Sequence, residues 1–235
     1  FLWTVRCNLH YISGRAEDRL TFDVQMEIAR RMGYRDHAGT RGVERLMKHY
    51  FLIAKDVGDL TRVLCAVLEE QHKKRQRRFP FFSNPFSKQK INDFAIDNGR
   101  LTVSGAKEFR DEPVKLIRLF LESLKNDIDV HPRALRWVRQ SLARIDDFLR
   151  SDPEANEAFL EILTAKRNPE KILMTMNEAG VFGRFVPDFG RVVAQMQYDM
   201  YHVYTVDEHT IRALGILHRI ESGDLAADHP ASTQV

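Results

Sequence analysis

The chain has 235 residues, of which 43% are hydrophobic and 29% charged, and its formal net charge is +3. This length allows one large domain or two small ones, and this composition excludes wholesale disorder. No apolar run is long enough to span a membrane, no signal peptide is visible, and two distant cysteines exclude a disulfide scaffold. We therefore expect a globular protein of the cytoplasm, with neither a membrane nor a nucleic acid as its partner.

Apolar residues follow a helical spacing along most of the chain, and glycines number only 12. This pattern predicts a mainly α fold, a multi-helix bundle with one long helix and a small β-hairpin near residues 94–103. The chain begins without methionine inside an apolar pattern and stops without a closing element. We therefore expect it to be a segment of a longer protein.

Two helices are expected at the start of the chain. The first covers residues 1–12 and is followed by Gly14. The second has an apolar repeat over 20–28 and ends near Gly33, a residue typical of a helix C-terminus.

The clearest element is a long helix over about residues 40–76. Its apolar residues alternate by three and four, as Val43, Leu46, Tyr50, Ile53, Val57, Leu60, Leu64 and Val67. Such a seam indicates an intramolecular antiparallel bundle, which we favour, or a dimerising coiled coil. Gly58 beside the seam predicts close packing or a bend.

The long helix ends in a basic run, and two further features follow it. The basic run 72–78 fits cations at a helix C-terminus, with nucleic-acid binding as the alternative. Phe79–Phe86 contains two prolines and four phenylalanines and predicts a linker, with a partner-docking loop as the alternative. Strand-forming residues then flank Asn98 and Gly99, a type I′ turn signal that predicts the hairpin.

Four apolar stripes predict the helices of the second half. The first begins after Pro113 and the second after Pro132. The third ends before Pro169, and the fourth ends at Gly180. The second stripe consists of Leu135, Val138, Leu142, Ile145 and Leu149. We expect the chain after the fourth stripe to be irregular because it contains three helix-breaking residues, Gly183, Pro187 and Gly190.

One histidine is a candidate metal ligand. Thr205 and Glu208 form a capping box, which predicts that a helix begins at Val206. His209 falls in the first turn, where the positive end of the helix dipole favours the neutral imidazole that binds metals. From spacing alone, a structural or merely exposed histidine is the commoner case. The same holds for His202, His218 and His229.

Four stretches of the sequence resemble one family. They are FLWTVRCNLHYISGRAEDRLTFDVQMEIARRMGY, VERLMKHYFLIAKDVGDLTR, DEPVKLIRLF and FVPDFGRVVAQMQYDMYHVYTVDEHTIRAL. Together they resemble the bifunctional PII uridylyltransferase/uridylyl-removing enzymes of bacterial nitrogen regulation. The resemblance is strongest over residues 1–34 and 185–214, and it is weak over 70–105 and after residue 218.

The resemblance implies an enzyme that moves UMP from UTP to the PII protein and removes it by hydrolysis, in response to glutamine. It implies Mg²⁺ or Mn²⁺ as the metal, with none bound tightly to this segment, and makes His209 the first histidine of an HD-type hydrolase signature. Residues 1–90 would be the helical domain after a nucleotidyltransferase domain, 91–203 a second helical part, and 204–235 the edge of the hydrolase domain.

Both expected active sites are incomplete in this chain. It contains neither the Gly-Ser motif of the nucleotidyltransferase nor any His-Asp doublet. We therefore expect the segment to be inactive alone, and to support and couple two catalytic domains. The alternative is a non-catalytic helical module for protein interaction.

Overall fold

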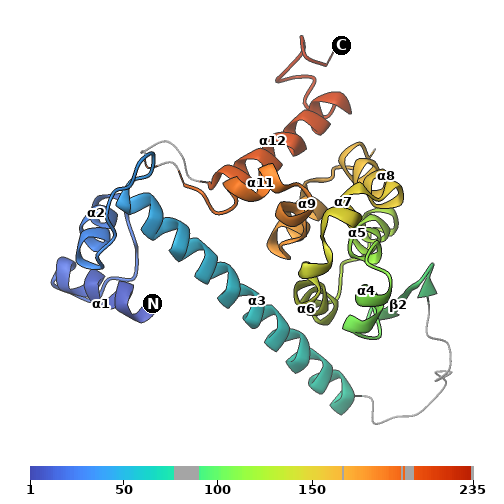
Figure 1. The fold of residues 1–235 in the computed structure, drawn as a ribbon, viewed down its shortest axis with the longest axis horizontal. Helices are drawn as coiled ribbons and strands as arrows, with labels where there is room; N and C mark the ends of the chain where they lie inside the picture. Colours follow the sequence, from blue (N-terminus) through green and yellow to red (C-terminus); the bar gives the residue numbers. More distant parts are fainter. Residues whose placement is uncertain (77–89, 166, 197, 199–203, 234–235) are drawn as a thin grey trace. The chain divides into compact units, whose positions relative to one another are not determined.

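The computed structural model describes residues 1–76, 90–165, 167–196, 198 and 204–233, without the side chains of 66 and 70–76. Within these ranges the chain forms α-helices, one short 3-10 helix and three short strands, and is mainly α as predicted (Figure 1). None of the helices in the described ranges is both long enough and apolar enough to cross a membrane.

The described chain folds as two compact units. The first consists of Phe1–Asp59 and Val192–His209, and the second of Leu60–Arg191 and Thr210–Val235. The expected boundaries after residues 90 and 203 concern the domains of a whole enzyme and stay a prediction.

The first unit is built on three helices, α1 (Leu2–Ser13), α2 (Phe22–Arg31) and the beginning of α3 (Gly42–Gln76). The first two confirm the sequence prediction. Gly14 ends α1 with a left-handed φ of 64°, and Gly33 follows α2 with a φ of 77°. The core of the unit is a cluster of buried residues, Leu9, Ile28, Ala29, Val43, Leu46, Met47 and Met196.

The long helix α3 is confirmed, but its apolar seam is fully buried only near its start. Leu46 is buried in the first unit, whereas Leu60 and Leu64 are 71% and 58% exposed. A Cβ at Gly58 would meet no atom within 4 Å, so the predicted close packing there is wrong. The basic run 72–78 and the segment Phe79–Phe86 lie outside the described side chains, and their predicted roles stay predictions.

The small sheet has the strands β1 (Lys90–Ile91), β2 (Phe94–Asp97) and β3 (Arg100–Thr102), antiparallel in this order. The predicted hairpin is confirmed, with Asp97 opposite Arg100. Asn98 and Gly99 between them have φ angles of 51° and 73°, as a type I′ turn requires. The sequence did not predict β1.

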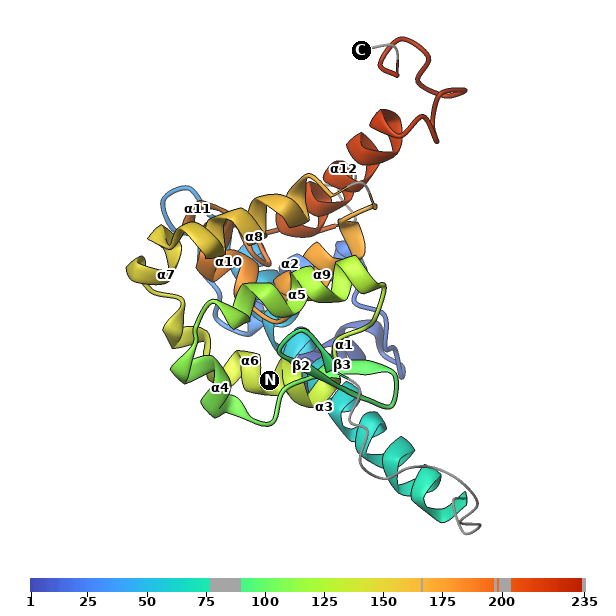
Figure 2. The same cartoon turned by 90° about the vertical axis from the view of Figure 1, so that its right-hand side faces the viewer.

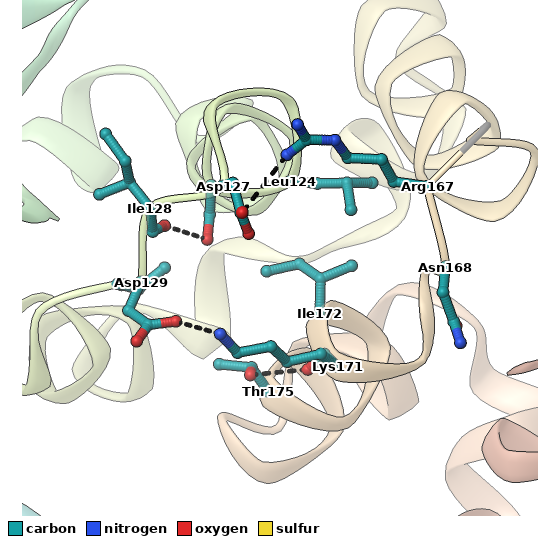
Figure 3. A pocket seen from close by; sticks show the side chains of 11 residues that line it. Leu124, Asp127, Ile128, Asp129, Arg167, Asn168, Lys171, Ile172 and Thr175 are labelled. Atoms are coloured by element: carbon teal, nitrogen blue, oxygen red, sulfur yellow. Dashed lines mark hydrogen bonds and ion pairs between the residues drawn. The ribbon is translucent and has the colours of Figure 1, made fainter.

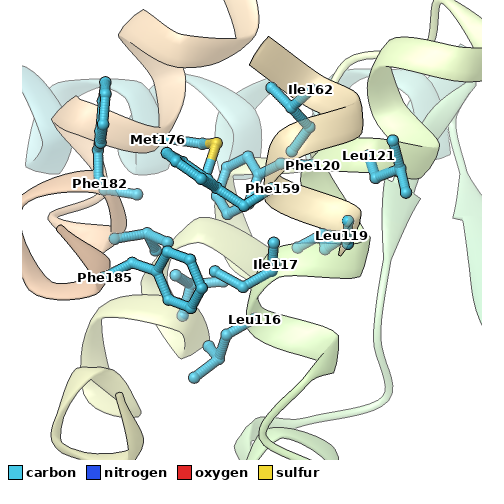
Figure 4. Close-up of a cluster of buried hydrophobic side chains, with 14 of the residues drawn as sticks. Leu116, Ile117, Leu119, Phe120, Leu121, Phe159, Ile162, Met176, Phe182 and Phe185 are labelled. Carbon is cyan, nitrogen blue, oxygen red and sulfur yellow. The ribbon is translucent and has the colours of Figure 1, made fainter. Parts of the chain in front are cut away.

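In the described part of the chain, nine more α-helices follow the sheet. They are α4 (Ala106–Asp111), α5 (Lys115–Asn126), α6 (Pro132–Gln140), α7 (Asp147–Ser151), α8 (Pro153–Leu163), α9 (Glu170–Glu178), α10 (Val181–Phe185), α11 (Pro187–Val192) and α12 (Val206–Glu221). In the second unit α5 and α8 lie side by side (Figure 2). Their facing side chains form the main core with those of α9 and α10, including Leu116, Phe120, Phe159, Ile162, Met176 and Phe182 (Figure 4).

Two predictions for the second half are wrong. The stripe over 135–149 is interrupted, because the Asp146 carboxylate accepts a hydrogen bond from the Leu149 N–H at 3.1 Å and starts a separate helix, α7. The stretch expected to be irregular forms α10 and α11. Gly190 serves close packing there, since a Cβ would lie 2.3 Å from the carbonyl oxygen of Gly183.

Candidate functional site

The first turn of α12 carries the candidate metal ligand. The helix begins at Val206, as the capping box predicts. The N–H of His209 donates to the carbonyl oxygen of Thr205 at 2.9 Å, which makes it the first helical hydrogen bond of this turn. Thr205 is buried, whereas the side chain of His209 is exposed. The imidazole is therefore carried on regular helix and is accessible from outside.

Two hydrogen bonds connect this turn to the chain that follows α11. The N–H of Val206 donates to the carbonyl oxygen of Gln195 at 2.9 Å. The N–H of Ala194 donates to Oδ1 of Asp207 at 3.1 Å, and Asp207 is only 4% exposed. Because one end of this bond is a buried carboxylate, the first turn of α12 is held in place immediately before His209.

The described residues do not form a complete metal site here. Nowhere in the described ranges do three or more His, Cys, Asp or Glu side chains gather as a metal site would need. An imidazole nitrogen is a donor that divalent metals accept, so His209 fits as one ligand of a larger set. The role predicted for it stays a prediction.

His218 and His229, the other candidate histidines in the described ranges, do not join His209 in a cluster of metal-ligand side chains. His218 lies half-buried near the end of α12, and His229 is exposed in the turns beyond that helix. His202 lies outside the described residues. None of the three gains a site role from the described geometry.

A small pocket of about 90 Å³ lies in the second unit between the end of α5 and the start of α9 (Figure 3). Arg167 pairs with Asp127 at 3.6 Å, and Nζ of Lys171 lies 2.6 Å from Oδ1 of Asp129. The hydrogen bond to Asp129 raises the pKa of Lys171 above its usual value. Since these charges are paired with one another across the pocket wall, the pocket offers a ligand little unbalanced charge.

No pattern in the sequence predicted this pocket, and its residues were not among the candidate site residues. Acidic and basic side chains there come from segments about 40 residues apart, so only the packing of α5 against α9 brings them together.

Comparison with known proteins relates the chain to one family. The family model described as GlnD PII-uridylyltransferase matches residues 1–65, and that of the uridylyltransferase GlnD third domain matches residues 94–185. Over its whole length, the chain is 59% identical to the bifunctional uridylyltransferase/uridylyl-removing enzyme of Azospirillum brasilense. The chain belongs to the GlnD uridylyltransferase family.

Other members of the GlnD family are similar along the same length. The bifunctional enzymes of Rhodospirillum rubrum and Novosphingobium aromaticivorans are 55% and 51% identical over 99% and 100% of the chain. The chain spans about a quarter of the length of these relatives, 25% to 26%. No solved structure matches it. His209 lies outside both matched family regions.

Proposed function

We propose that this chain is the helical middle of a bifunctional enzyme that transfers UMP from UTP to the PII protein and removes it again in response to glutamine. The observation that carries the proposal is the 59% identity, over the whole chain, with an enzyme named for both activities. The description of one matching family model names PII as the protein that is uridylylated. The two exposed free cysteines, Cys7 and Cys65, suit the reducing cytoplasm in which we place the enzyme.

The segment's own role, in this proposal, is to support and couple two catalytic domains. The helices of the second unit that follow the sheet share one continuous core, which includes Phe120, Phe159 and Met176. Helices packed in this way move as a body, because close-packed interiors have few alternative arrangements. A signal that displaces one of them is therefore passed to the others.

His209 is the part of the segment that we assign to uridylyl removal. It would be one ligand of a Mg²⁺ or Mn²⁺ ion, which when bound supplies Lewis-acid polarisation of the phosphoryl group. The contribution of this chain is positional. Hydrogen bonds of Asp207 and Val206 hold the first turn of α12 in place, and with it the backbone position from which the exposed His209 side chain extends.

Two assays test whether the segment is inactive alone and whether it couples the two activities. We expect the full-length enzyme to uridylylate PII and to release UMP from uridylylated PII, and the 235-residue chain to do neither. Either activity in the chain alone would contradict the proposal. For coupling, mild core variants of the full-length enzyme, Ile162→Val and Met176→Leu, should change the ratio of the two activities. An unchanged ratio together with lowered stability would assign these residues to stability only.

A second candidate function rests on the exposed part of α3. Leu60, Leu64 and Leu68 are 71%, 58% and 44% exposed, although they continue an apolar seam. Such a stripe favours a helical module for protein interaction. Loss of self-association or PII binding in Leu64→Glu, with the fold unchanged, would support this function, and unchanged association would remove it.

A further inference from the structure

A cavity of about 530 Å³ opens in the first unit beside the start of α3. It has the volume of a small organic ligand rather than of a single water. Its lining is mostly polar and comes from the loop before α3, from α3 itself and from the chain after α11, as His37, Thr40, Glu44, Arg45, Lys48, Gln195 and Met196.

Two cations of the lining lie on one face of α3. Arg45 and Lys48 are three residues apart, so their side chains leave the helix in similar directions. The ammonium group of Lys48 has no hydrogen bond or ion pair to any part of the chain that the structure describes. Arg45 donates to the carbonyl oxygen of Arg35 at 2.9 Å through Nη1, which leaves its other N–H groups available.

The one carboxylate of the lining is engaged elsewhere. Oε2 of Glu44 accepts from the N–H of Arg41 at 2.8 Å, and Oε1 accepts from the N–H of Tyr198 at 3.4 Å. Neither cation of the cavity is paired with it in the described structure. The cavity wall therefore keeps a positive charge, and Thr40 and Gln195 add neutral hydrogen-bond donors.

We propose that this cavity binds a phosphate-bearing anion. A guanidinium fork beside an ammonium group suits the several oxygens of a phosphate, and the binding of such a group would compensate the unpaired charge of Lys48. The cavity has room for more than one phosphate, so the ligand class is pyrophosphate or the phosphate chain of a nucleotide. The proposal does not depend on His209 or on either activity of the proposed enzyme.

The test measures binding to the 235-residue chain by calorimetry, with sodium pyrophosphate and UTP as separate probes. We expect pyrophosphate to bind and Lys48→Gln to weaken its binding about tenfold or more. Lys48→Arg should retain most of the affinity. The matched control is Lys107→Gln, which removes the same charge from an exposed position outside the cavity. Lys48→Gln should fold normally, because Lys48 has no described partner to lose, and circular dichroism checks this.

The probes separate the sources of the phosphate. Equal affinities for pyrophosphate and UTP would mean that the phosphate chain alone is recognised, and a higher affinity for UTP would add a nucleoside contact. The proposal is overturned if pyrophosphate does not bind, if citrate binds equally well, or if Lys48→Gln and Lys107→Gln have the same effect.

Discussion

The buried carboxylate of Asp207 holds the backbone of Ala194, whose N–H lies 3.1 Å from Oδ1. Ala194 has a left-handed φ of 56°, which costs a residue with a Cβ about 1 kcal/mol. A hydrogen bond to a buried charged group is worth more than this. Asp207 therefore stabilises the turn that leads into α12 and to His209.

Replacing Asp207 should loosen this turn. Asp207→Ala leaves the Ala194 N–H buried without its acceptor, and we expect a loss of about 1–3 kcal/mol in the free energy of unfolding. Asp207→Asn keeps an acceptor oxygen and should lose less. Urea denaturation and hydrogen exchange at Ala194 measure both effects. An Ala194 amide that stays as protected in Asp207→Ala as in the wild type would show that this bond is unimportant.

Two glycines should respond in opposite ways to the same substitution. At Gly190 a Cβ would lie 2.3 Å from the carbonyl oxygen of Gly183, so Gly190→Ala must move backbone and should cost about 1–3 kcal/mol. At Gly58, inside α3, a Cβ meets nothing within 4 Å, and Gly58→Ala should stabilise the chain by about 0.4–1 kcal/mol. Thermal unfolding should show a lower Tm for Gly190→Ala and a higher Tm for Gly58→Ala than for the wild type. Shifts of Tm in the same direction would contradict the described packing.

Glu122 should matter for the sheet as well as for its own helix. Its buried carboxylate accepts from Nδ2 of Asn92 at 2.8 Å and of Asn126 at 3.1 Å. Glu122→Ala leaves both amides without this acceptor, so we expect a loss of about 1–3 kcal/mol and faster hydrogen exchange in β1 and β2. Glu161→Ala, which removes an exposed carboxylate of the same unit, is the control and should cost less than about 1 kcal/mol. Similar losses in the two variants would refute a special role for Glu122.

The sequence predicted the fold well wherever residues that are neighbours in the chain determine the backbone conformation. The ends of α1 at Gly14 and the hairpin at Asn98 and Gly99 depend on backbone conformations that neighbouring residues specify. The errors occur where a single polar side chain, or a contact between residues distant in the sequence, determines the local structure. A periodic stripe did not reveal that Asp146 begins a new helix, or that Gly190 packs against Gly183.

The same distinction between local patterns and tertiary packing applies to the candidate sites. The place of His209 in the first turn of α12 follows from a capping box four residues long, so sequence alone predicts it. The bond from Asp207 to Ala194 joins residues 13 apart, and the cavity brings Lys48 of α3 to Gln195. No pattern within one helix could show either, because both depend on tertiary packing.

Glu27 gives the first unit a defined dependence on pH. Hydrogen bonds from Arg30 first, and then from Arg31, lower the pKa of its carboxyl from 4.5 to about 2. Because the folded pKa is depressed, the stabilisation is complete above about pH 4.5 and is lost as the pH falls through about 2. Titration of the side-chain carboxyl by NMR should show this midpoint, and Arg30→Gln should raise it more than Arg31→Gln. A wild-type midpoint near 4.5 would contradict the paired geometry.

The most direct test compares His209→Ala with His218→Ala in the full-length enzyme. Replacing a residue that hydrogen-bonds to a metal ligand typically lowers activity about 10- to 100-fold, and loss of the ligand itself should lower it more. We therefore predict that the rate of UMP release from uridylylated PII falls roughly 100-fold or more in His209→Ala. Transfer of UMP to PII should continue, and His218→Ala should keep both activities. If His209→Ala folds normally and still releases UMP at the wild-type rate, His209 is not a ligand of the hydrolase metal.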